Sequence, residues 1–350
     1  IFDVLPEKVK LGVRKIRMGT PHNPWDLATH RVPGGSSSGS GVAVAAGLAP
    51  AALGSDTGGS VRIPSALNGI TGLKTTFGLV SLHGAVPLSH TLDSIGPMTR
   101  DARDAMLLTQ LLAGPDAADP ATLAAPLLDY GLPVESAMPL AGVCIRVLPP
   151  SQYPVALSAE ALGAFEAACD MLRGLGATIE EIAAPFDFHA FMVRNGQLIA
   201  AEAYAFHEEY IEDPALPLGQ YVRARILGGN GIGSADYIHA LQEHAESKRA
   251  WREWMRDADA LLTPTVPFPA VPLSEVDEAQ TPMASFTRAG NFMGACGLAL
   301  PAGFSANGLP LSVQLLAKPF DDARLCRIGM AFQEASDWHR KTPDLSSLGL

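Results

Sequence analysis

Cysteine is scarce in this chain, and its pattern argues against two kinds of stabilising framework. The 350 residues include four cysteines, which lie far apart, show no CxxC spacing and have no paired histidines nearby. Zinc motifs and disulfide frameworks need such spacing, so we expect neither, and no bound metal. Each cysteine lies in an apolar run, which predicts reduced thiols in the core and favours a cytoplasmic location. The four residues are Cys144, Cys169, Cys296 and Cys326.

Basic residues and long apolar runs are also few. The chain has 25 Lys and Arg against 36 Asp and Glu, and the resulting net charge of −11 is spread along the sequence. This balance argues against nucleic acid or an anionic membrane as a partner. No uninterrupted apolar stretch reaches the roughly 18 residues of a membrane-spanning helix. We therefore expect a globular protein without a nucleic-acid or membrane partner, and the oligomeric state stays open, with a homodimer among the expected forms.

Strand and helix patterns alternate after residue 101. Residues 142–148 form a short apolar run closed by two prolines, which predicts a buried strand. Ser158 can cap a following helix that ends at the next glycines, and residues 177–182 then return as a strand. The apolar residues expected on one face of this helix are Leu162, Phe165, Cys169 and Leu172.

The same alternation recurs near the end of the chain. Residues 309–317 read as a strand, and Asp321 or Asp322 begins a helix. Its core positions are Leu325, Ile328 and Phe332. Residues 186–256 look mainly helical, with an amphipathic stretch at 234–255. This order predicts one α/β domain over residues 1–350, in which helices cover a sheet.

Two glycine- and serine-rich segments, residues 33–41 and 54–62, need a different explanation. Such runs are often flexible linkers. Here an apolar, alanine-rich segment follows the first run directly, so that run is tied to a buried element. A phosphate-binding loop is disfavoured because the lysine and hydroxyl of GxxxxGK[ST] are missing. What these segments offer is a serine presented by glycines.

Acyl transfer by serine needs a nucleophilic hydroxyl, a base for its proton and donors for the oxyanion that forms. In Thr57-Gly58-Gly59-Ser60 the glycines allow a tight turn and let a substrate carbonyl approach the backbone N–H groups. We therefore expect Ser60 as the nucleophile, with an oxyanion hole formed by Thr57, Gly58 and Gly59.

These segments resemble the signature of the amidase-signature family. The resemblance rests on the order and spacing of residues 35–40, 54–65, 69–74 and 91–100. Weaker similarity to the family's C-terminal landmarks is found at residues 261–265, 291–294 and 308–315. The resemblance covers nearly the whole chain. It implies an α/β fold with a central mixed, twisted β-sheet covered by helices on both faces.

The resemblance also implies a triad of serine, cis-serine and lysine. By motif position Ser60 is the acylated nucleophile, and Ser36, joined to its neighbour by a cis peptide bond, relays a proton between Ser60 and the lysine. The family's lysine lies several dozen residues before the middle serine, whereas 35 residues precede Ser36. Lys74 belongs to a Gly-Leu-Lys landmark that is structural in the family. We expect the triad lysine in an N-terminal portion ahead of Ile1, and the alternative is an inactive relative.

Three further residues are expected around the nucleophile: Ser37, Asp56 and Arg62. Arg62 either anchors a substrate carboxylate or pairs with Asp56 beneath the loop, and we favour the ion pair. Ser37, with its neighbour Ser38, either bonds to the relay or stabilises the loop. A Ser/His/Asp triad stays open on composition, although no local histidine is nominated as a partner for Ser60.

The predicted function is that of an amidase, which hydrolyses a small or medium-sized carboxamide through a seryl acyl-enzyme without metal or organic cofactor. One alternative within this chemistry is hydrolysis of a carbamate, urea-type or aryl-amide bond. Another is the glutaminase (A) subunit of a tRNA-dependent amidotransferase, which would need partner subunits. Residues 79–86 look closer to stand-alone amidases, so we rank the glutaminase second. The third alternative is an inactive, non-catalytic relative.

Overall fold

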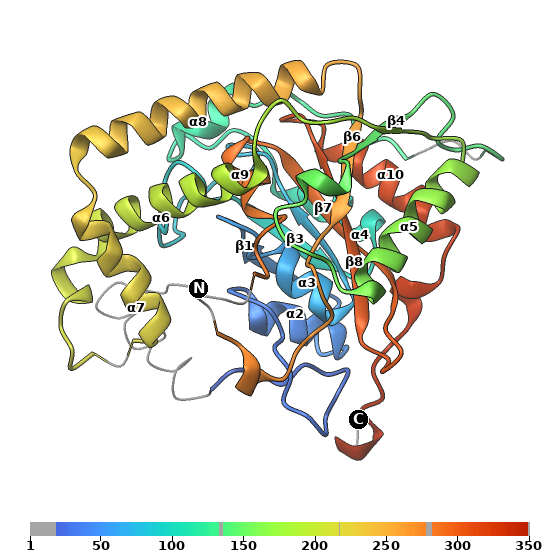
Figure 1. The fold of residues 1–350 in the computed structure, drawn as a ribbon, viewed down its shortest axis with the longest axis horizontal. Coiled ribbons are helices and arrows are strands. Elements are labelled where there is room, and N and C mark those ends of the chain that lie inside the picture. Colours follow the sequence, from blue (N-terminus) through green and yellow to red (C-terminus); the bar gives the residue numbers. More distant parts are fainter. Residues whose placement is uncertain (1–18, 133–135, 217, 278–281, 349–350) are drawn as a thin grey trace.

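The strands of this protein join one sheet. The computed structural model describes residues 19–132, 136–216, 218–277 and 282–348 (Figure 1). Within them, eight strands lie in the order β1-β3-β2-β7-β8-β6-β4-β5. Strand β4 pairs in parallel with β5 and β6, and the other neighbours are antiparallel, so the sheet is mixed. The strands are β1 (Ala51–Ser55), β2 (Thr71–Lys74), β3 (Ile95–Thr99), β4 (Cys144–Val147), β5 (Thr178–Glu181), β6 (Ala260–Pro264), β7 (Cys296–Phe304) and β8 (Pro310–Ala317).

Helices cover one face of the sheet over the largest apolar core. These helices are α4 (Ala102–Leu112), α5 (Ala159–Gly174) and α10 (Asp322–Glu334). Side chains from alternate positions of β7 and β8 meet them, because successive residues of a strand point to opposite faces. Helix α10 approaches closely at Gly329, where an added Cβ would lie 2.6 Å from the Leu298 side chain.

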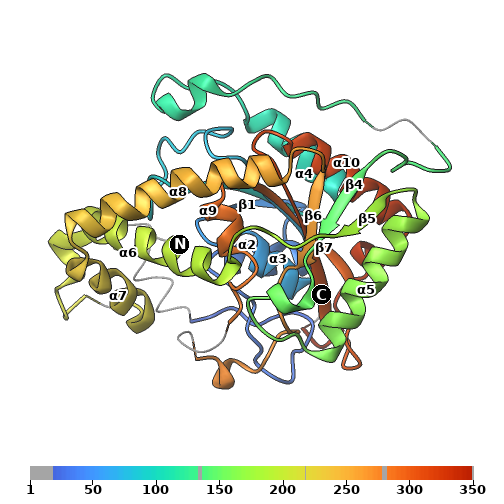
Figure 2. The same cartoon turned by 45° about the horizontal axis from the view of Figure 1, so that its top comes forward.

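The opposite face carries the remaining described helices. Short helix α3 packs against β7 and β8, and α9 packs against α6. In Figure 2 the long helices α6 and α8 lie on the other side of the strands from α5 and α10. The helices of this face are α2 (Ser38–Ala45), α3 (Arg62–Asn68), α6 (Phe188–Ile211), α7 (Gln220–Leu227), α8 (Ser234–Trp254) and α9 (Arg288–Phe292). Single 3₁₀ turns span Pro120–Ala124, Pro150–Gln152, Gly228–Gly231, Leu273–Glu275, Trp338–Arg340 and Ser346–Leu348.

Most elements expected from the sequence are confirmed, with two corrections. The strands predicted at 142–148, 177–182 and 309–317 are β4, β5 and β8, and the amphipathic stretch is α8. Leu162 was placed on the wrong face of α5, because its side chain is 37% exposed. All four cysteines are free, but Cys144 is only partly buried, because it opens a strand near the edge of the sheet. No described helix is long and apolar enough to cross a membrane.

Helix α5 offers a test of the predicted cap. The Ser158 hydroxyl oxygen accepts a hydrogen bond from the Ala161 amide at 3.1 Å. Replacing such a cap by alanine typically costs about 0.5–2 kcal/mol, so Ser158→Ala should lower the midpoint of urea unfolding. The matched control is Ser234→Ala at the start of α8, where Gly233 holds the cap position and makes no side-chain hydrogen bond. Equal midpoints for the two variants would contradict the assignment of the cap.

Candidate active site

The two glycine- and serine-rich segments meet at the start of α3. The Ser37 amide donates to the Ser60 carbonyl at 3.3 Å, so the chain at Ser36 lies beside the predicted nucleophile. The Gly35–Ser36 peptide bond is cis, as the resemblance implies. Gly34 adopts φ 77°, and a Cβ there would lie 2.7 Å from the Pro64 Cα. The first segment is therefore packed against α3 and is not a linker.

The buried carboxylate of Asp56 holds the part of the second segment that surrounds Ser60. Asp56 is fully buried, and its Oδ1 accepts from the Gly59 amide at 2.8 Å. Its Oδ2 accepts from the amides of Val61 and Arg62 at 3.3 and 3.4 Å. Backbone amides on both sides of Ser60 are thus bound to one side chain. A loop of small residues has few apolar contacts of its own, so this carboxylate fixes its shape.

The same carboxylate pairs with Arg62 beneath the loop. The Arg62 side chain is completely buried, and its Nε donates to Asp56 Oδ2 at 3.0 Å. Its other nitrogens donate to Gln314 Oε1 at 2.9 Å and Asn291 Oδ1 at 2.6 Å. Burial raises the pKa of Asp56, but the neighbouring Arg62 guanidinium outweighs it and lowers that pKa to about 2. Arg62 therefore faces the protein interior and has no side exposed to a substrate.

Several backbone amides near Ser60 are left without a partner. In a trans peptide the N–H points opposite to the C=O of the same peptide group. Where a carbonyl of the loop binds a neighbouring side chain or amide, the N–H of the next residue therefore points away from that group. The Asp56 carbonyl accepts from Asn291 Nδ2 at 3.2 Å, and the Thr57 carbonyl accepts from Asn195 Nδ2 at 3.2 Å. The Gly59 carbonyl accepts from the Ile63 amide at 2.7 Å. The following amides, those of Thr57, Gly58 and Ser60, have no acceptor within the described residues. They are uncommitted donors on one short loop.

The amide of Gly59 differs from the expected set. The Thr287 hydroxyl donates to the Gly58 carbonyl at 2.8 Å, which turns the next amide toward Asp56. Gly59 adopts φ 124°, and a Cβ there would lie 2.2 Å from Thr287 Oγ1. This glycine is therefore required by close packing, and its amide is engaged in holding the loop. The Ser60 amide takes its place among the uncommitted donors.

Comparison with known proteins identifies the family of this chain. The family model described as Amidase matches residues 12–326. The A subunit of glutamyl-tRNA(Gln) amidotransferase from Roseiflexus sp. (strain RS-1) is 38% identical over 353 residues, covering 92% of this chain and 70% of the relative. The corresponding protein of Chloroflexus aggregans is 36% identical, covering 93% and 70%. This chain belongs to the amidase-signature family.

Solved structures of the family share the fold. The glutamyl-tRNA(Gln) amidotransferase A subunit of Thermotoga maritima superposes with a TM-score of 0.76 at 35% identity, covering 90% of this chain and 68% of that one. The peptide amidase PAM bound to chymostatin superposes with a TM-score of 0.78 at 28% identity, covering 95% and 71%. The mixed sheet with helices on both faces is therefore the amidase-signature fold, as the sequence implied.

Lys74 of this amidase-family chain lies beneath the same loop. Its side chain is 2% exposed, and its Nζ donates to the carbonyls of Ala295 and Thr75 at 2.8 and 3.0 Å. Burial lowers the pKa of Lys74 to about 8, although the nearby Asp56 carboxylate opposes the change. Its described hydrogen bonds join β2 to the start of β7, which is the structural position expected for the Gly-Leu-Lys landmark.

Sequence reasoning missed several side chains that position the loop. Asn195 comes from α6, and Thr287 and Asn291 come from the region of α9. Asp93 accepts a short hydrogen bond from the Thr57 hydroxyl, and burial raises the pKa of this carboxyl. Residues 291–294 were recognised as a family landmark, but no local pattern indicated that Asn291 reaches Asp56. Such contacts join residues far apart in the chain.

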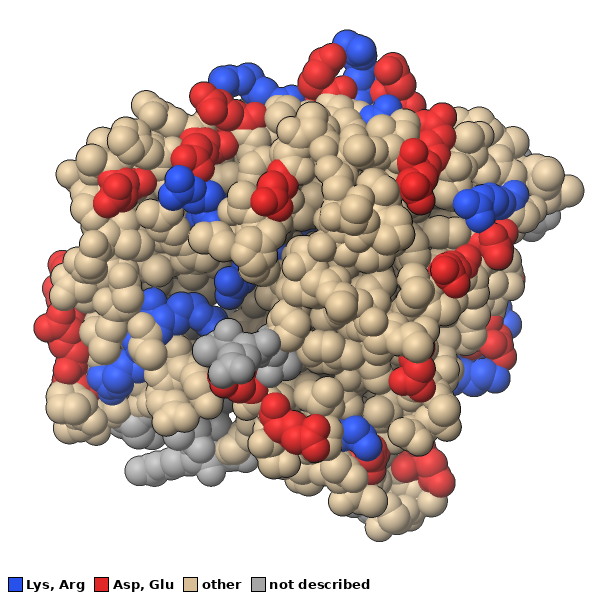
Figure 3. Space-filling view, in the orientation of Figure 1, with Lys and Arg blue, Asp and Glu red and all other residues tan. Residues whose placement is uncertain are grey.

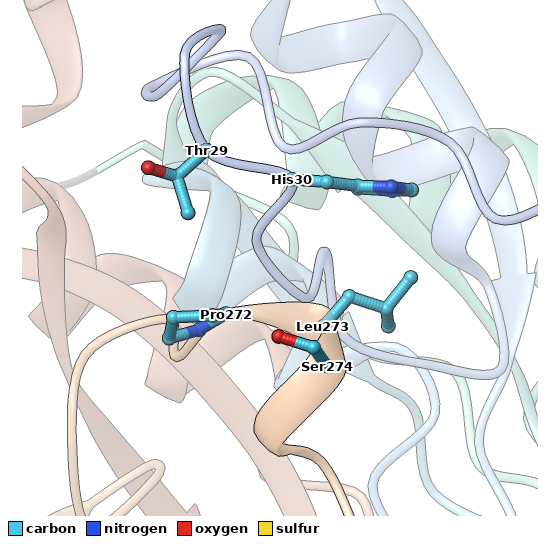
Figure 4. Close-up of a pocket in the computed structure, with 5 residues that line it drawn as sticks. All are labelled: Thr29, His30, Pro272, Leu273 and Ser274. Atoms are coloured by element: carbon cyan, nitrogen blue, oxygen red, sulfur yellow. The ribbon is translucent and has the colours of Figure 1, made fainter.

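A surface hollow elsewhere on the molecule does not belong to this site. Its volume is about 410 Å³, and none of the predicted site residues lines it (Figure 4). Its lining residues are Thr29, His30, Pro272, Leu273 and Ser274. Within the described ranges, no group of three or more His, Cys, Asp or Glu side chains could hold a metal ion.

The ion pair under the loop predicts a response to acid. The folded pKa of Asp56, about 2, lies below its ordinary value of 3.8, so the carboxylate stabilises the fold above that value. This stability should be lost as pH falls from 3.8 toward 2. Asp56→Asn leaves the Arg62 charge buried without its partner and should cost about 3–5 kcal/mol in the free energy of unfolding.

Urea unfolding at several pH values measures both effects. Asp170→Asn is the control, because the Asp170 side chain is 78% exposed and pairs with Arg173 on the surface. The control should change stability little. A loss in Asp56→Asn no larger than in the control would contradict the role given to the ion pair.

Proposed function

We propose that this chain hydrolyses a carboxamide through an acyl-enzyme on Ser60. The Ser60 hydroxyl attacks the amide carbonyl, and its proton passes to Ser36. The C–N bond then breaks, the nitrogen leaves as ammonia or an amine with a proton returned by the relay, and water releases the acid from Ser60. Family membership supports this class of reaction. The structural observation that carries the proposal is the set of uncommitted amides around Ser60.

Those amides match what acyl transfer requires. The tetrahedral intermediate places negative charge on the former carbonyl oxygen, and preorganised N–H donors stabilise that charge. We propose that Thr57, Gly58 and Ser60 supply them, while Gly59 holds the loop through Asp56. Losing one such donor typically costs about 2.7–4 kcal/mol of transition-state stabilisation. A loop fixed by a buried ion pair keeps these donors aligned without reorganisation during the reaction.

The relay beyond Ser36 needs a base. We propose that this base is a lysine, in accordance with the family's triad. Lys74 is not assigned this role, because its ammonium is bonded to the carbonyls of Thr75 and Ala295. A lysine is neutral near pH 7, and so able to accept a proton, only where burial lowers its pKa. Tests of activity therefore use the full-length protein.

Ser60 and Ser36 should respond differently to substitution. Ser60→Ala should abolish labelling by a serine-directed fluorophosphonate and amide hydrolysis together. Ser36→Ala should keep the nucleophile but lower kcat by about 10²–10⁴-fold, the usual contribution of a proton-transfer group. Ser40→Ala is the control, because the Ser40 hydroxyl donates to the Leu53 carbonyl and, within the described residues, has no contact with Ser60. Ammonia release and mass spectrometry of the labelled peptide measure these outcomes, and labelling that survives in Ser60→Ala would refute the proposal.

A second candidate is the glutaminase subunit of a tRNA-dependent amidotransferase. The curated relatives from Roseiflexus and Chloroflexus carry that enzyme's name and match over nine tenths of this chain. They favour this candidate over the stand-alone amidase that residues 79–86 suggested. Solved relatives also include a peptide amidase and a 6-aminohexanoate cyclic dimer hydrolase, so the fold is compatible with both. Hydrolysis of carbamate, urea-type or aryl-amide bonds remains within the same proposed chemistry.

Two measurements separate these candidates. A glutaminase subunit should release ammonia from L-glutamine and copurify with partner subunits when tagged in its native host. A stand-alone amidase should hydrolyse simple carboxamides such as butyramide as a single purified chain and copurify with no stoichiometric partner. Strong turnover of butyramide by the full-length protein purified without partners, together with no turnover of L-glutamine, would reject the glutaminase candidate.

A further inference from the structure

Arg288 is a cation that has no part in the proposed bond cleavage. It begins α9 and is only partly exposed. Within the part of the chain that the structure describes, its guanidinium forms no ion pair with a carboxylate and no hydrogen bond. Removing a charge from water is costly unless a partner compensates it. None of its nitrogen atoms is among the sealed, unsatisfied polar atoms, so the guanidinium still faces open space.

The Arg288 side chain lies directly against the nucleophile loop. A Cβ added to Gly58, two residues before Ser60, would lie 3.1 Å from the Arg288 Cγ and 3.6 Å from its Nε. A Cβ added to Gly196 on α6 would lie 3.2 Å from its Nη1. Two glycines therefore leave the space that this side chain occupies, between α6 and the loop.

The preceding residue fixes this arrangement. The Thr287 hydroxyl donates to the Gly58 carbonyl at 2.8 Å, so the start of α9 is bound to the loop beside Arg288. The guanidinium is therefore held near the place where the substrate carbonyl must bind. Its Nε lies beside Gly58, two residues before Ser60, on the side of the loop that faces α6.

A second cation, Arg225, lies near Arg288. Burial and, to a smaller extent, this neighbouring cation lower the pKa of Arg288 to about 10. The Arg288 side chain therefore stays charged at neutral pH. Figure 3 shows a hollow between the part of the surface over α6 and α7 and the body of the sheet, with Lys or Arg side chains in its wall.

Arg62 and Arg288 contrast sharply in their neighbours. Arg62 is fully buried and satisfied by Asp56, Gln314 and Asn291. Arg288 has none of these partners, although both arginines lie close to the loop that carries Ser60. A planar guanidinium presents paired N–H donors that match a carboxylate in a bidentate geometry. Of these two arginines, Arg288 is therefore the one that has N–H donors available for a ligand.

We propose that Arg288 binds a carboxylate on the acyl part of the substrate, so that the preferred substrates are short monoamides of dicarboxylic acids or similar anionic carboxamides. This inference rests on the proposed hydrolysis at Ser60 and narrows its substrate class. Arg288 acts here in specificity and not in bond cleavage. A role in stabilising the oxyanion predicts a different result, because that role would serve charged and neutral amides equally.

Paired substrates test this selectivity in the full-length protein. Succinamate and 4-methylpentanamide have similar shapes, but only the first carries a carboxylate. Arg288→Gln should lower kcat/KM for succinamate by about 10- to 100-fold, mainly through KM, because a hydrogen bond to a charged group contributes about 1.5–3 kcal/mol. It should leave 4-methylpentanamide turnover nearly unchanged. Arg249→Gln on α8, whose side chain is 73% exposed, is the control for loss of one positive charge.

Two further variants keep the test decisive. Gly196→Ala should displace the guanidinium by a few tenths of an ångström, since the added methyl meets only the flexible end of that side chain. Its effect should fall on succinamate alone and be smaller than that of Arg288→Gln. Binding of succinamate to Ser60→Ala, measured by calorimetry, should weaken when Arg288→Gln is added, and this readout does not depend on turnover.

The possible results separate this inference from the proposed function. If wild-type protein hydrolyses both amides equally well and Arg288→Gln changes neither, the inference fails while the amidase proposal stands. An equal loss for both amides would assign Arg288 to the oxyanion or to the fold, and would also overturn the inference. If neither amide is hydrolysed, the proposed function fails for these substrates, and the calorimetric comparison alone decides whether Arg288 binds the carboxylate.

Discussion

The buried ion pair of Asp56 and Arg62 is the constraint on which the site depends. The loop that presents Ser60 is built from small residues, so it cannot hold its shape through apolar packing. Asp56 replaces that packing with hydrogen bonds to the amides of Gly59, Val61 and Arg62. The charge this requires is balanced by Arg62, which is anchored by residues of other elements. The shape of the loop and the charge balance of the core therefore depend on the same ion pair.

The residues that hold the loop and the ion pair come from opposite ends of the chain. The loop lies between β1 and α3, in the first part of the sequence, whereas Asn291 and Gln314 come from α9 and β8. Strand β7 lies between β2 and β8, which places these late elements against the early ones. The mixed sheet thus places the Ser60 loop, from the first part of the chain, against the side chains from the last part that hold it. The carbonyls of Asp56 and Thr57 bind the side chains of Asn291 and Asn195, so the amides of Thr57 and Gly58 point away from those side chains.

Two arginines next to the same loop illustrate how neighbours decide the role of a residue. Arg62 has a carboxylate and two amide oxygens as partners and serves the fold. Arg288 lies against Gly58 and Gly196 without such partners and is left for a ligand. Family membership indicates an amidase-family hydrolase, and in the proposed function the Ser60 loop acts on the substrate carbonyl. The groups around the loop determine which carbonyl compound is accepted.

The sequence by itself indicated the family, strands β4, β5 and β8, and helices α5, α8 and α10, and it nominated Ser36 and Ser60, because these depend on local patterns. Glycine spacing around Ser36 and Ser60 is a local signal, and so is the periodicity of α5, α8 and α10. Only the tertiary structure decided that the Gly59 amide is held by Asp56, and that Arg62 is satisfied while Arg288 is not. Those outcomes depend on contacts such as Arg62 to Gln314, which join residues 252 positions apart. No local pattern encodes which distant side chain a buried charge will meet, since that is set by how the sheet assembles.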